Sequence, residues 1–316
     1  MKIWITRPLP PRVIEAAQAL GEVEVRSETL PLTPGELRLA LAEFDVVLPT
    51  LGDMFNASVF ADVSKPRAKL LANFGVGFNH IDVAAAKSAG VIVSNTPGAV
   101  TDATADIAVM LILMSARRAS EGEAMVRADT WEGWHPTQLL GLHVSGKRIG
   151  IVGMGRIGQA IAKRMHYGFG CEINYVNRSH KSIDTPATQV GNLKELAGQV
   201  DVLVAAIPGG AETHHMVDAE VFSAMQPHAH FVNIARGDVV DEQALIAALQ
   251  EGQIAGAGLD VYEFEPKVPD VLREMKQVTL LPHLGTAALE VREAMGLMAV
   301  ENIAALLRGE TPPNLV

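Results

Sequence analysis

A regular alternation of short apolar runs with helical patterns constrains the fold of this chain more than any other feature. In the first third of the 316 residues, the apolar runs predict strands and the segments between them predict helices. Such alternation predicts a mostly parallel sheet covered by helices on both faces. The expected strands are Lys2–Ile5, Glu22–Val25, Asp45–Leu48, Lys69–Asn73 and Val91–Ser94, and the expected helices are Pro11–Leu20, Pro34–Ala42 and Asp82–Ala89.

A break at Asn95-Thr96-Pro97-Gly98 separates this region from a second set of the same patterns. Thr101 to about Arg127 predicts one long helix, and a looser stretch with two tryptophans follows, residues 131–146. We therefore expect two doubly wound α/β domains joined at about residue 98. The expected later strands are Arg148–Val152, Glu172–Val176, Val202–Ala205, His230–Ile234, Ile254–Leu259 and Val278–Leu281, and the helices are Arg156–Met165, Asn192–Ala197, Ala219–Met225, Glu242–Gln250 and Ala287–Leu307.

A glycine-rich turn, Gly153-Met-Gly155-Arg-Ile-Gly158, joins a predicted strand directly to a predicted amphipathic helix. In this context the three glycines predict a dinucleotide site. Gly153 permits the tight turn, Gly155 lets the backbone approach a pyrophosphate, and Gly158 lets helix and strand pack closely. The free N–H groups at the helix start, around Arg156 and Ile157, would face the anion. The alternative is a glycine-rich turn without a ligand.

The residues after the next strand bear on the choice of dinucleotide. An NAD-preferring site usually carries Asp or Glu there, to hold the ribose hydroxyls. This chain has Asn177-Arg178-Ser179 instead. Arg178 can pair with a 2′-phosphate, and Asn177 and Ser179 can donate hydrogen bonds to it. We therefore expect NADP(H) to be preferred, with NAD(H) possible; the alternative is that Arg178 is a solvated loop residue.

Three segments near the ends of late strands carry an arginine, a glutamate and a histidine, namely Arg236, Glu265 and His283. Reduction of a 2-oxo acid needs a cation for the carboxylate and carbonyl, and the planar fork of Arg236 suits that role. It also needs a proton donor, for which His283 suits, and a carboxylate that orients the imidazole, for which Glu265 suits. The alternatives are a surface ion pair for the arginine and a satisfied polar group for the histidine.

Two histidine pairs, His214-His215 and His228-x-His230, raise the question of a metal. No carboxylate–histidine motif accompanies them, and adjacent histidines in a strand or loop usually point apart. We therefore expect no catalytic metal.

Composition excludes some partners. A diffuse net charge of −10 argues against a nucleic-acid partner, because phosphate binding needs a basic face. The longest apolar run, about Ile107 to Ser115, is too short to span a bilayer, and the first residues lack the apolar run of a signal peptide. The single cysteine, Cys171, can form no internal disulfide. These features favour a cytoplasmic protein.

In combination and order, five motifs resemble those of the D-isomer-specific 2-hydroxyacid dehydrogenase family, over nearly the whole chain. The resemblance implies a nicotinamide-dependent enzyme that reduces 2-oxo acids to D-2-hydroxy acids. The motifs are Asn73-Phe-Gly75-Val-Gly77…Ile81-Asp82, Gly153-Met-Gly155-Arg-Ile-Gly158, Asn233-Ile-Ala-Arg236-Gly237, Asp260-Val-Tyr-Glu-Phe-Glu265-Pro266 and Pro282-His283-Leu-Gly285.

The resemblance also implies roles for particular residues. Arg236, Glu265 and His283 would be catalytic, with His283 as proton donor, and Asp260 would contact the nicotinamide amide. The substrate would be bound by Arg236 and His283 and by Leu51, Phe74, Gly75, Val76 and Gly77, with carboxylate contacts from the N–H groups of Val76 and Gly77. The expected cofactor contacts are Thr104, Gly153, Gly155, Arg156, Ile157, Gly158, Asn177, Arg178, Ser179, Ile207, Pro208, Thr213, Ile234, Ala235, Arg236, Asp260, His283 and Gly285. Relatives often carry a Cys-Pro-Leu-Thr-like run at Ile207-Pro208-Gly209-Gly210, which is a departure here.

The resemblance further implies the domain plan. Residues 1–98, completed by the C-terminal helix in 287–316, would be the substrate-binding domain, and 99–286 the dinucleotide-binding domain, with the active-site cleft between them. The region around residues 100–146 would form the arm of a homodimer, so Trp131 and Trp134 would lie at an interface.

Within the family, Asn177-Arg178-Ser179 and the stretch Trp131–Leu140 are most similar to glyoxylate/hydroxypyruvate reductases. Small acids are favoured because the apolar residues near Leu51 and Phe74 would narrow the pocket. The alternatives are a D-lactate, phenylpyruvate or 2-ketogluconate-type reductase, with phosphite and formate oxidation ranked lower. A protein of another class, a non-catalytic dinucleotide-sensing corepressor, would also be compatible with an intact catalytic trio.

Overall fold

The structure is a computed structural model that describes residues 1–316. The chain divides into two compact units. Unit 1 comprises Met1–Val100 and Thr286–Val316, and unit 2 comprises Thr101–Gly285. Both units are parallel α/β sheets, which confirms the predicted fold class.

Unit 1 contains five parallel strands in the order β2-β1-β3-β4-β5. This is the flavodoxin-like order, whose direction of winding reverses between β1 and β3, and ligands of such sheets bind at the carboxyl ends of strands. The elements of unit 1 are β1 (Lys2–Ile5), α1 (Pro11–Gln18), β2 (Glu22–Val25), α2 (Pro34–Glu43), β3 (Val46–Leu48), α3 (Ala57–Ala61), β4 (Leu70–Ala72), α4 (Val83–Ser88), β5 (Ile92–Ser94) and α12 (Leu289–Leu307).

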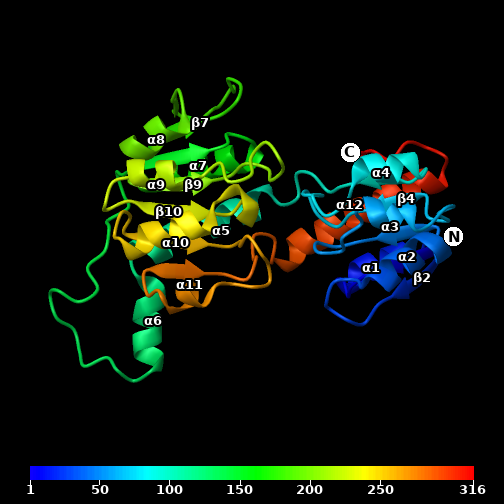
Figure 1. The fold of residues 1–316 in the computed structure, drawn as a ribbon, viewed down its shortest axis with the longest axis horizontal. Coiled ribbons are helices and arrows are strands. Elements are labelled where there is room, and N and C mark those ends of the chain that lie inside the picture. The colour runs from blue at the N-terminus through cyan, green and yellow to red at the C-terminus, as the bar shows by residue number, and fades with distance from the viewer. The chain divides into compact units, whose positions relative to one another are not determined.

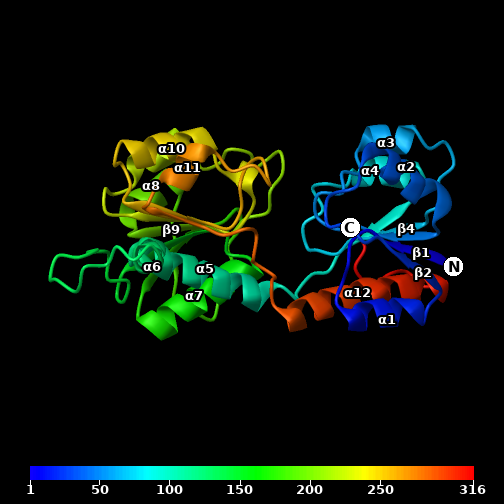
Figure 2. The same cartoon turned by 90° about the horizontal axis from the view of Figure 1, so that it is seen from below.

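Helices cover both faces of the unit 1 sheet (Figure 2). Helices α1 and α12 pack side by side on one face, and α2, α3 and α4 cover the other. The close approach of α1 and α12 depends on a glycine: a Cβ at Gly296 would lie 2.4 Å from a methyl carbon of Val13. The C-terminal helix is therefore an integral part of the core of the first 100 residues.

Unit 2 contains seven parallel strands in the order β12-β11-β10-β9-β6-β7-β8. Its winding reverses between β6 and β9, as in dinucleotide-binding sheets. The elements of unit 2 are α5 (Thr101–Ala116), α6 (Ala119–Arg127), β6 (Arg148–Val152), α7 (Arg156–Phe169), β7 (Glu172–Val176), β8 (Thr188–Gln189), α8 (Leu193–Gln199), β9 (Val202–Ala205), α9 (Ala219–Ala224), β10 (His230–Asn233), a 3-10 turn η1 (Gly237–Val239), α10 (Glu242–Gln250), β11 (Gly256–Leu259), α11 (Asp270–Glu274) and β12 (Val278–Leu280).

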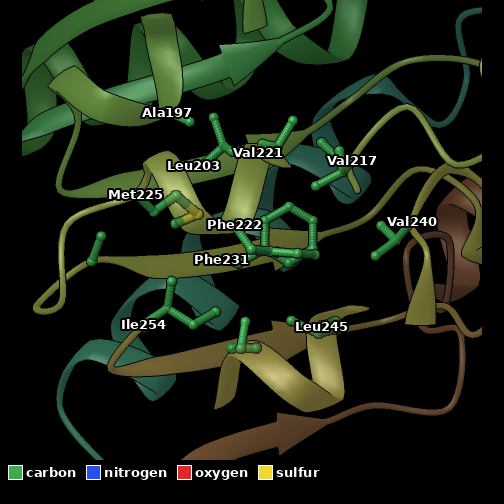
Figure 3. Close-up of a cluster of buried hydrophobic side chains, with 14 of the residues drawn as sticks. Ala197, Leu203, Val217, Val221, Phe222, Met225, Phe231, Val240, Leu245 and Ile254 are labelled. Carbon is green, nitrogen blue, oxygen red and sulfur yellow. The ribbon is translucent and has the colours of Figure 1, made fainter. Parts of the chain in front are cut away.

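The central strands of unit 2 are buried on both faces, which explains their uninterrupted apolar sequences. Helices α5 and α7 pack on one face, and α8 to α11 pack on the other (Figures 1 and 2). On the second face, Phe222 of α9 meets Phe231 of β10 edge to face, with ring centroids 5.3 Å apart (Figure 3). This rigid core fixes the strand ends from which the candidate site is built.

Every strand predicted from the sequence is present, with ends within two residues of the prediction. The single helix predicted from Thr101 to Arg127 was wrong, because the helix breaks at Arg118, which has a left-handed φ of 54°. The backbone of Leu142 returns to donate a hydrogen bond to the carbonyl of Ala116, at 2.8 Å. Four short elements were not predicted, namely α3, β8, η1 and α11, and each is too short to show a period.

None of the helices is both long enough and apolar enough to cross a membrane.

Candidate active site

The three predicted catalytic side chains follow three neighbouring strands of unit 2. Arg236 follows β10, Glu265 lies in the loop after β11, and His283 follows β12. Because these strands are adjacent and parallel, their carboxyl ends meet at one edge of the sheet. The fold thereby places loops together that are far apart in the sequence.

The imidazole of His283 is hydrogen-bonded to the carboxylate of Glu265. The distance between His283 Nδ1 and Glu265 Oε2 is 2.9 Å, and the two side chains are 28% and 30% exposed. The other carboxylate oxygen, Oε1, accepts a hydrogen bond from the backbone N–H of Tyr262 at 3.0 Å. Nδ1 must therefore carry a proton, and Nε2 is the ring nitrogen left for chemistry.

Glu265 remains ionised in this setting. Burial raises the pKa of its carboxyl group, but the hydrogen bond and the charge of His283, the Tyr262 N–H and the charge of Arg236 together outweigh burial. The net effect is a pKa below the usual value. A carboxylate that stays negative keeps accepting the hydrogen bond from Nδ1 and so holds the ring in one orientation.

Asp260 holds the loop that carries His283. Its side chain is buried, and its two carboxylate oxygens accept hydrogen bonds from the N–H groups of Leu284 (2.6 Å) and Gly285 (2.8 Å). Its carbonyl accepts the N–H of His283 at 2.9 Å. His283 itself has a left-handed φ of 54°, a backbone conformation that residues other than glycine rarely adopt. The structure thus gives Asp260 an anchoring role that the sequence did not predict.

Arg236 is a half-buried cation with no carboxylate within ion-pair distance. Its Nη1 donates to the carbonyl of Ala235 at 2.6 Å. Burial lowers the pKa of the guanidinium, with Glu265 and Asp238 acting in the opposite direction, yet an arginine stays charged in proteins. The side chain of Asn233 fixes this turn, because it binds both the N–H of Ala235 and the carbonyl of Arg236, each at 3.0 Å.

The glycine-rich turn after β6 fits a dinucleotide, and its three glycines have three different surroundings. Gly153 has a φ of 97°, and a Cβ there would lie 2.4 Å from the Ile207 side chain. A Cβ at Gly158 would lie 2.1 Å from the carbonyl oxygen of Gly153. A Cβ at Gly155 would meet no atom within 4 Å, so this glycine opens onto free space at the start of α7. A pyrophosphate needs such an open approach to a helix N-terminus.

Two threonines expected along the cofactor bind backbone carbonyls of loops at this edge. Thr104 Oγ1, in α5, donates to the carbonyl of Gly285 at 3.1 Å. Thr213 Oγ1 donates to the carbonyl of Pro208 at 2.8 Å, within the loop after β9 that also contains Ile207. The other expected residues of this edge, Ile234 and Ala235, are buried directly after β10.

The loop after β7 begins with Asn177, Arg178 and Ser179, and none of these three residues is a carboxylate. Asn177 serves the fold here, because its Oδ1 accepts the N–H of Met154 at 3.2 Å and its Nδ2 donates to the carbonyl of Ser179 at 2.7 Å. Arg178 Nη1 lies 2.8 Å from Glu212 Oε2, and these side chains are 91% and 83% exposed. Sequence reasoning missed Glu212, since 34 residues separate the pair and no motif relates them.

The predicted substrate residues of unit 1 follow β3 and β4. Leu51 is exposed after β3, and the loop Phe74–Gly77 follows β4. Arg7 and the buried Asp53 brace the first loop: Arg7 Nη1 donates to the carbonyl of Leu51 at 2.6 Å, and its Nη2 lies 3.2 Å from Asp53 Oδ1. Neither residue was predicted, because a lone charged residue after a strand shows no pattern.

The adjacent histidines do not point apart, which corrects a sequence expectation. The rings of His214 and His215 stack, with centroids 3.9 Å apart. With Glu263 they place three potential metal-ligand atoms within 4.8 Å of one another. His215 Nε2 lies 2.8 Å from Glu263 Oε1, so these two side chains are hydrogen-bonded to each other.

Comparison with known proteins gives matches over the whole chain. Residues 109–285 match the D-isomer specific 2-hydroxyacid dehydrogenase, NAD binding domain. A glyoxylate reductase from Thermococcus kodakarensis is 42% identical over 100% of this chain and 96% of its own length.

Solved structures agree with this similarity. An NADPH-dependent glyoxylate/hydroxypyruvate reductase from Sinorhizobium meliloti, in complex with NADP and malonate, is 34% identical with a TM-score of 0.87, covering 100% of this chain and 96% of that one. A glyoxylate reductase from Paecilomyes thermophila is 30% identical with a TM-score of 0.87, covering 100% and 98%. The chain belongs to the D-isomer specific 2-hydroxyacid dehydrogenase family.

Proposed function

We propose that this protein is an NADPH-dependent reductase that converts small 2-oxo acids, foremost glyoxylate and hydroxypyruvate, to D-2-hydroxy acids. The observation that carries the proposal is the hydrogen bond between His283 and Glu265, beside the half-buried cation of Arg236, which has no carboxylate within ion-pair distance. These groups lie on the sheet edge that also carries the open glycine turn. The edge thus supplies a proton donor, a cation and a dinucleotide site.

The chemistry assigns one task to each side chain. A dinucleotide held at the turn Gly153–Gly158 would supply the hydride that the carbonyl carbon of the substrate accepts. Arg236 binds the 2-oxo acid and polarises its carbonyl, as a planar cation can. His283 donates the proton on Nε2 to the carbonyl oxygen, which completes the alcohol. Glu265 keeps the ring oriented through Nδ1 and stabilises its charged form before transfer.

Two loops of unit 1 supply further proposed contacts to the substrate. The N–H groups of Val76 and Gly77 bind the substrate carboxylate, and Leu51 and Phe74 limit the size of its side chain. In the proposed division of labour, residues 1–98 with 287–316 bind substrate, and 99–286 bind the dinucleotide.

The preference for NADP(H) rests on the loop after β7. A carboxylate directly after the strand would repel a 2′-phosphate, and residues 177–179 contain none. Arg178 and Ser179 are exposed and able to bind a phosphate. The Sinorhizobium relative, which is described as NADPH-dependent, supports the same choice. NAD(H) remains a second cofactor in this proposal.

A homodimer and a cytoplasmic location are part of the proposal. The segment 100–146 contains α5, α6 and a long loop without regular structure (Figure 1). This loop exposes Trp131, Trp134 and Leu140, an apolar set that a partner subunit would cover. Cys171 is a buried free thiol, which needs no oxidising compartment.

Initial rates with a panel of 2-oxo acids test the proposal. The purified protein is assayed with glyoxylate, hydroxypyruvate, pyruvate, phenylpyruvate and 2-ketogluconate, with NADPH and then with NADH. We expect the highest kcat/KM for glyoxylate or hydroxypyruvate with NADPH. The His283→Ala variant should lose turnover by about a hundredfold or more while it still binds NADPH. No turnover of any acid by the wild-type protein, with NADPH binding intact, would instead support the dinucleotide-sensing class.

A pair of glycine substitutions tests the dinucleotide site. Gly155→Ala adds a methyl group to open space, so the protein should fold normally but bind NADPH about tenfold or more weakly. Gly158→Ala forces a clash with a backbone oxygen and should lower Tm. Gly168→Ala is the control, because it lies in the same helix with no atom within 4 Å. Wild-type NADPH affinity in Gly155→Ala, measured by fluorescence titration, would contradict this site.

Two substitutions at the exposed ion pair test the cofactor preference. Arg178→Ala should raise KM for NADPH about tenfold and leave KM for NADH nearly unchanged. Glu212→Gln releases Arg178 and removes a negative charge, so KM for NADPH should fall about two- to fivefold. Lys194→Ala and Glu220→Gln form the control, because they dismantle another exposed ion pair of unit 2. An unchanged NADPH-to-NADH ratio in Arg178→Ala would remove the case for 2′-phosphate recognition.

A further inference from the structure

We propose that Asn73 and Asn95, with His80 behind Asn73, are positioning residues that hold the loop Phe74–Gly77 as a preformed carboxylate site. The proposal rests on the function proposed above, since it takes the substrate carboxylate as the anion. These three polar side chains belong to unit 1 and are not part of the proposed catalytic trio. The proposal gives them a role in binding substrate.

Three consecutive carbonyl groups of the loop are bound by the protein itself. Asn73 Nδ2 donates to the carbonyl oxygens of Gly75 at 3.1 Å and Gly77 at 3.0 Å. Asn95 Nδ2 donates to the carbonyl oxygen of Val76, between them, at 2.9 Å. The backbone N–H of Thr96 also donates to Gly75, at 3.1 Å. Amide side chains therefore fix the direction of the three peptide units that carry these carbonyls.

Two N–H groups of the same turn are left unused. Neither Val76 nor Gly77 donates its backbone N–H within the protein, and both residues are accessible to solvent. The carbonyls of Gly75, Val76 and Gly77 are held by amide side chains, so these two N–H groups are the unpaired donors of the turn. Successive backbone N–H groups arranged in this way bind anions, and a carboxylate has the oxygens that they require.

The orientation of Asn73 is itself determined. Its Nδ2 makes two donor contacts, so its Oδ1 must be the atom that lies 3.0 Å from His80 Nε2. His80 therefore donates from Nε2. Both side chains are buried, so the amide cannot exchange these partners for water.

The backbones of Asn73 and Asn95 are held by hydrogen bonds to residues outside the loop Phe74–Gly77. Asn73 follows β4, and its N–H donates to the carbonyl of Ser94 at 2.9 Å. The N–H of Asn95 donates to the carbonyl of Asn314 at 3.0 Å, so the C-terminal segment supports it. The geometry of the turn is thus fixed before a substrate arrives, which reduces the ordering cost of binding.

Substitutions at Asn73 test the proposal. Asn73→Ala and the isosteric Asn73→Asp both remove the two donor contacts, so the carbonyl of Gly77 is released and that of Gly75 keeps only the N–H of Thr96. We expect KM for glyoxylate and Ki for oxalate, an unreactive dicarboxylate, to rise about tenfold or more. The Kd for NADPH, which depends on unit 2, should stay within about twofold of the wild-type value. The two variants together separate the loss of donors from the negative charge that Asp adds.

A conservative pair at His80 distinguishes positioning from general stability. His80→Gln keeps an amide nitrogen able to donate to Asn73, so it should retain KM near the wild-type value. His80→Ala should raise KM several-fold. Asn56→Ala is the control, because it removes the cap of α3 in the same unit without touching the loop. It should lower Tm and leave KM unchanged.

Two outcomes would overturn the proposal. In one, Asn73→Ala lowers Tm but leaves KM and the oxalate Ki unchanged. In the other, calorimetric titration of the wild-type protein and Asn73→Ala with oxalate gives equal affinities. The titration does not depend on turnover, so it decides the proposal even if the wild-type protein reduces no 2-oxo acid. That inactivity would refute the proposed function alone.

Discussion

The common direction of the strands in each sheet is the constraint on which the rest of the structure depends. Parallel strands end at one edge, so the loops that follow them meet there, although long crossovers separate them in the sequence. In unit 2 this edge carries, in the order of the strands, His283, Glu265, Arg236, Ile207, the glycine turn and Arg178. The residues proposed for chemistry thus lie at one end of a row and those proposed for the adenosine at the other. An elongated dinucleotide would fit along this row.

Polar groups that follow the strands of unit 2 divide into those that hold loops and those left available to a ligand. Asp260, Asn233 and Asn177 hold turns through backbone hydrogen bonds. The guanidinium of Arg236 donates to one backbone carbonyl only, that of Ala235. The Nε2 atom of His283 has no hydrogen-bond partner, because the ring binds Glu265 through Nδ1. Leaving a cation and a donor uncommitted costs stability, and such groups are typical of sites where a ligand supplies the missing partner.

Much of the fold was predictable, because strand and helix periods and the glycine punctuation act locally. The glycine turn and the three strand-end residues were predictable because each carries a motif. The break at Arg118 was not, since it depends on a tertiary hydrogen bond from Leu142. The Arg178–Glu212 pair, the stacking of His214 on His215 and the bracing of Leu51 by Arg7 were also out of reach. Each of these contacts depends on the path of a loop in three dimensions. The spacing of residues along the chain does not predict which side chains a loop brings together.

The central claim is hydride transfer to a 2-oxo acid with a fixed stereochemical outcome, and the configuration of the product tests it most directly. Hydroxypyruvate is incubated with the wild-type protein and NADPH, and the glycerate formed is resolved by chiral chromatography. We expect D-glycerate as the product, with the L isomer below the detection limit of the method. L-glycerate, or a racemic product formed at an enzymatic rate, would contradict it.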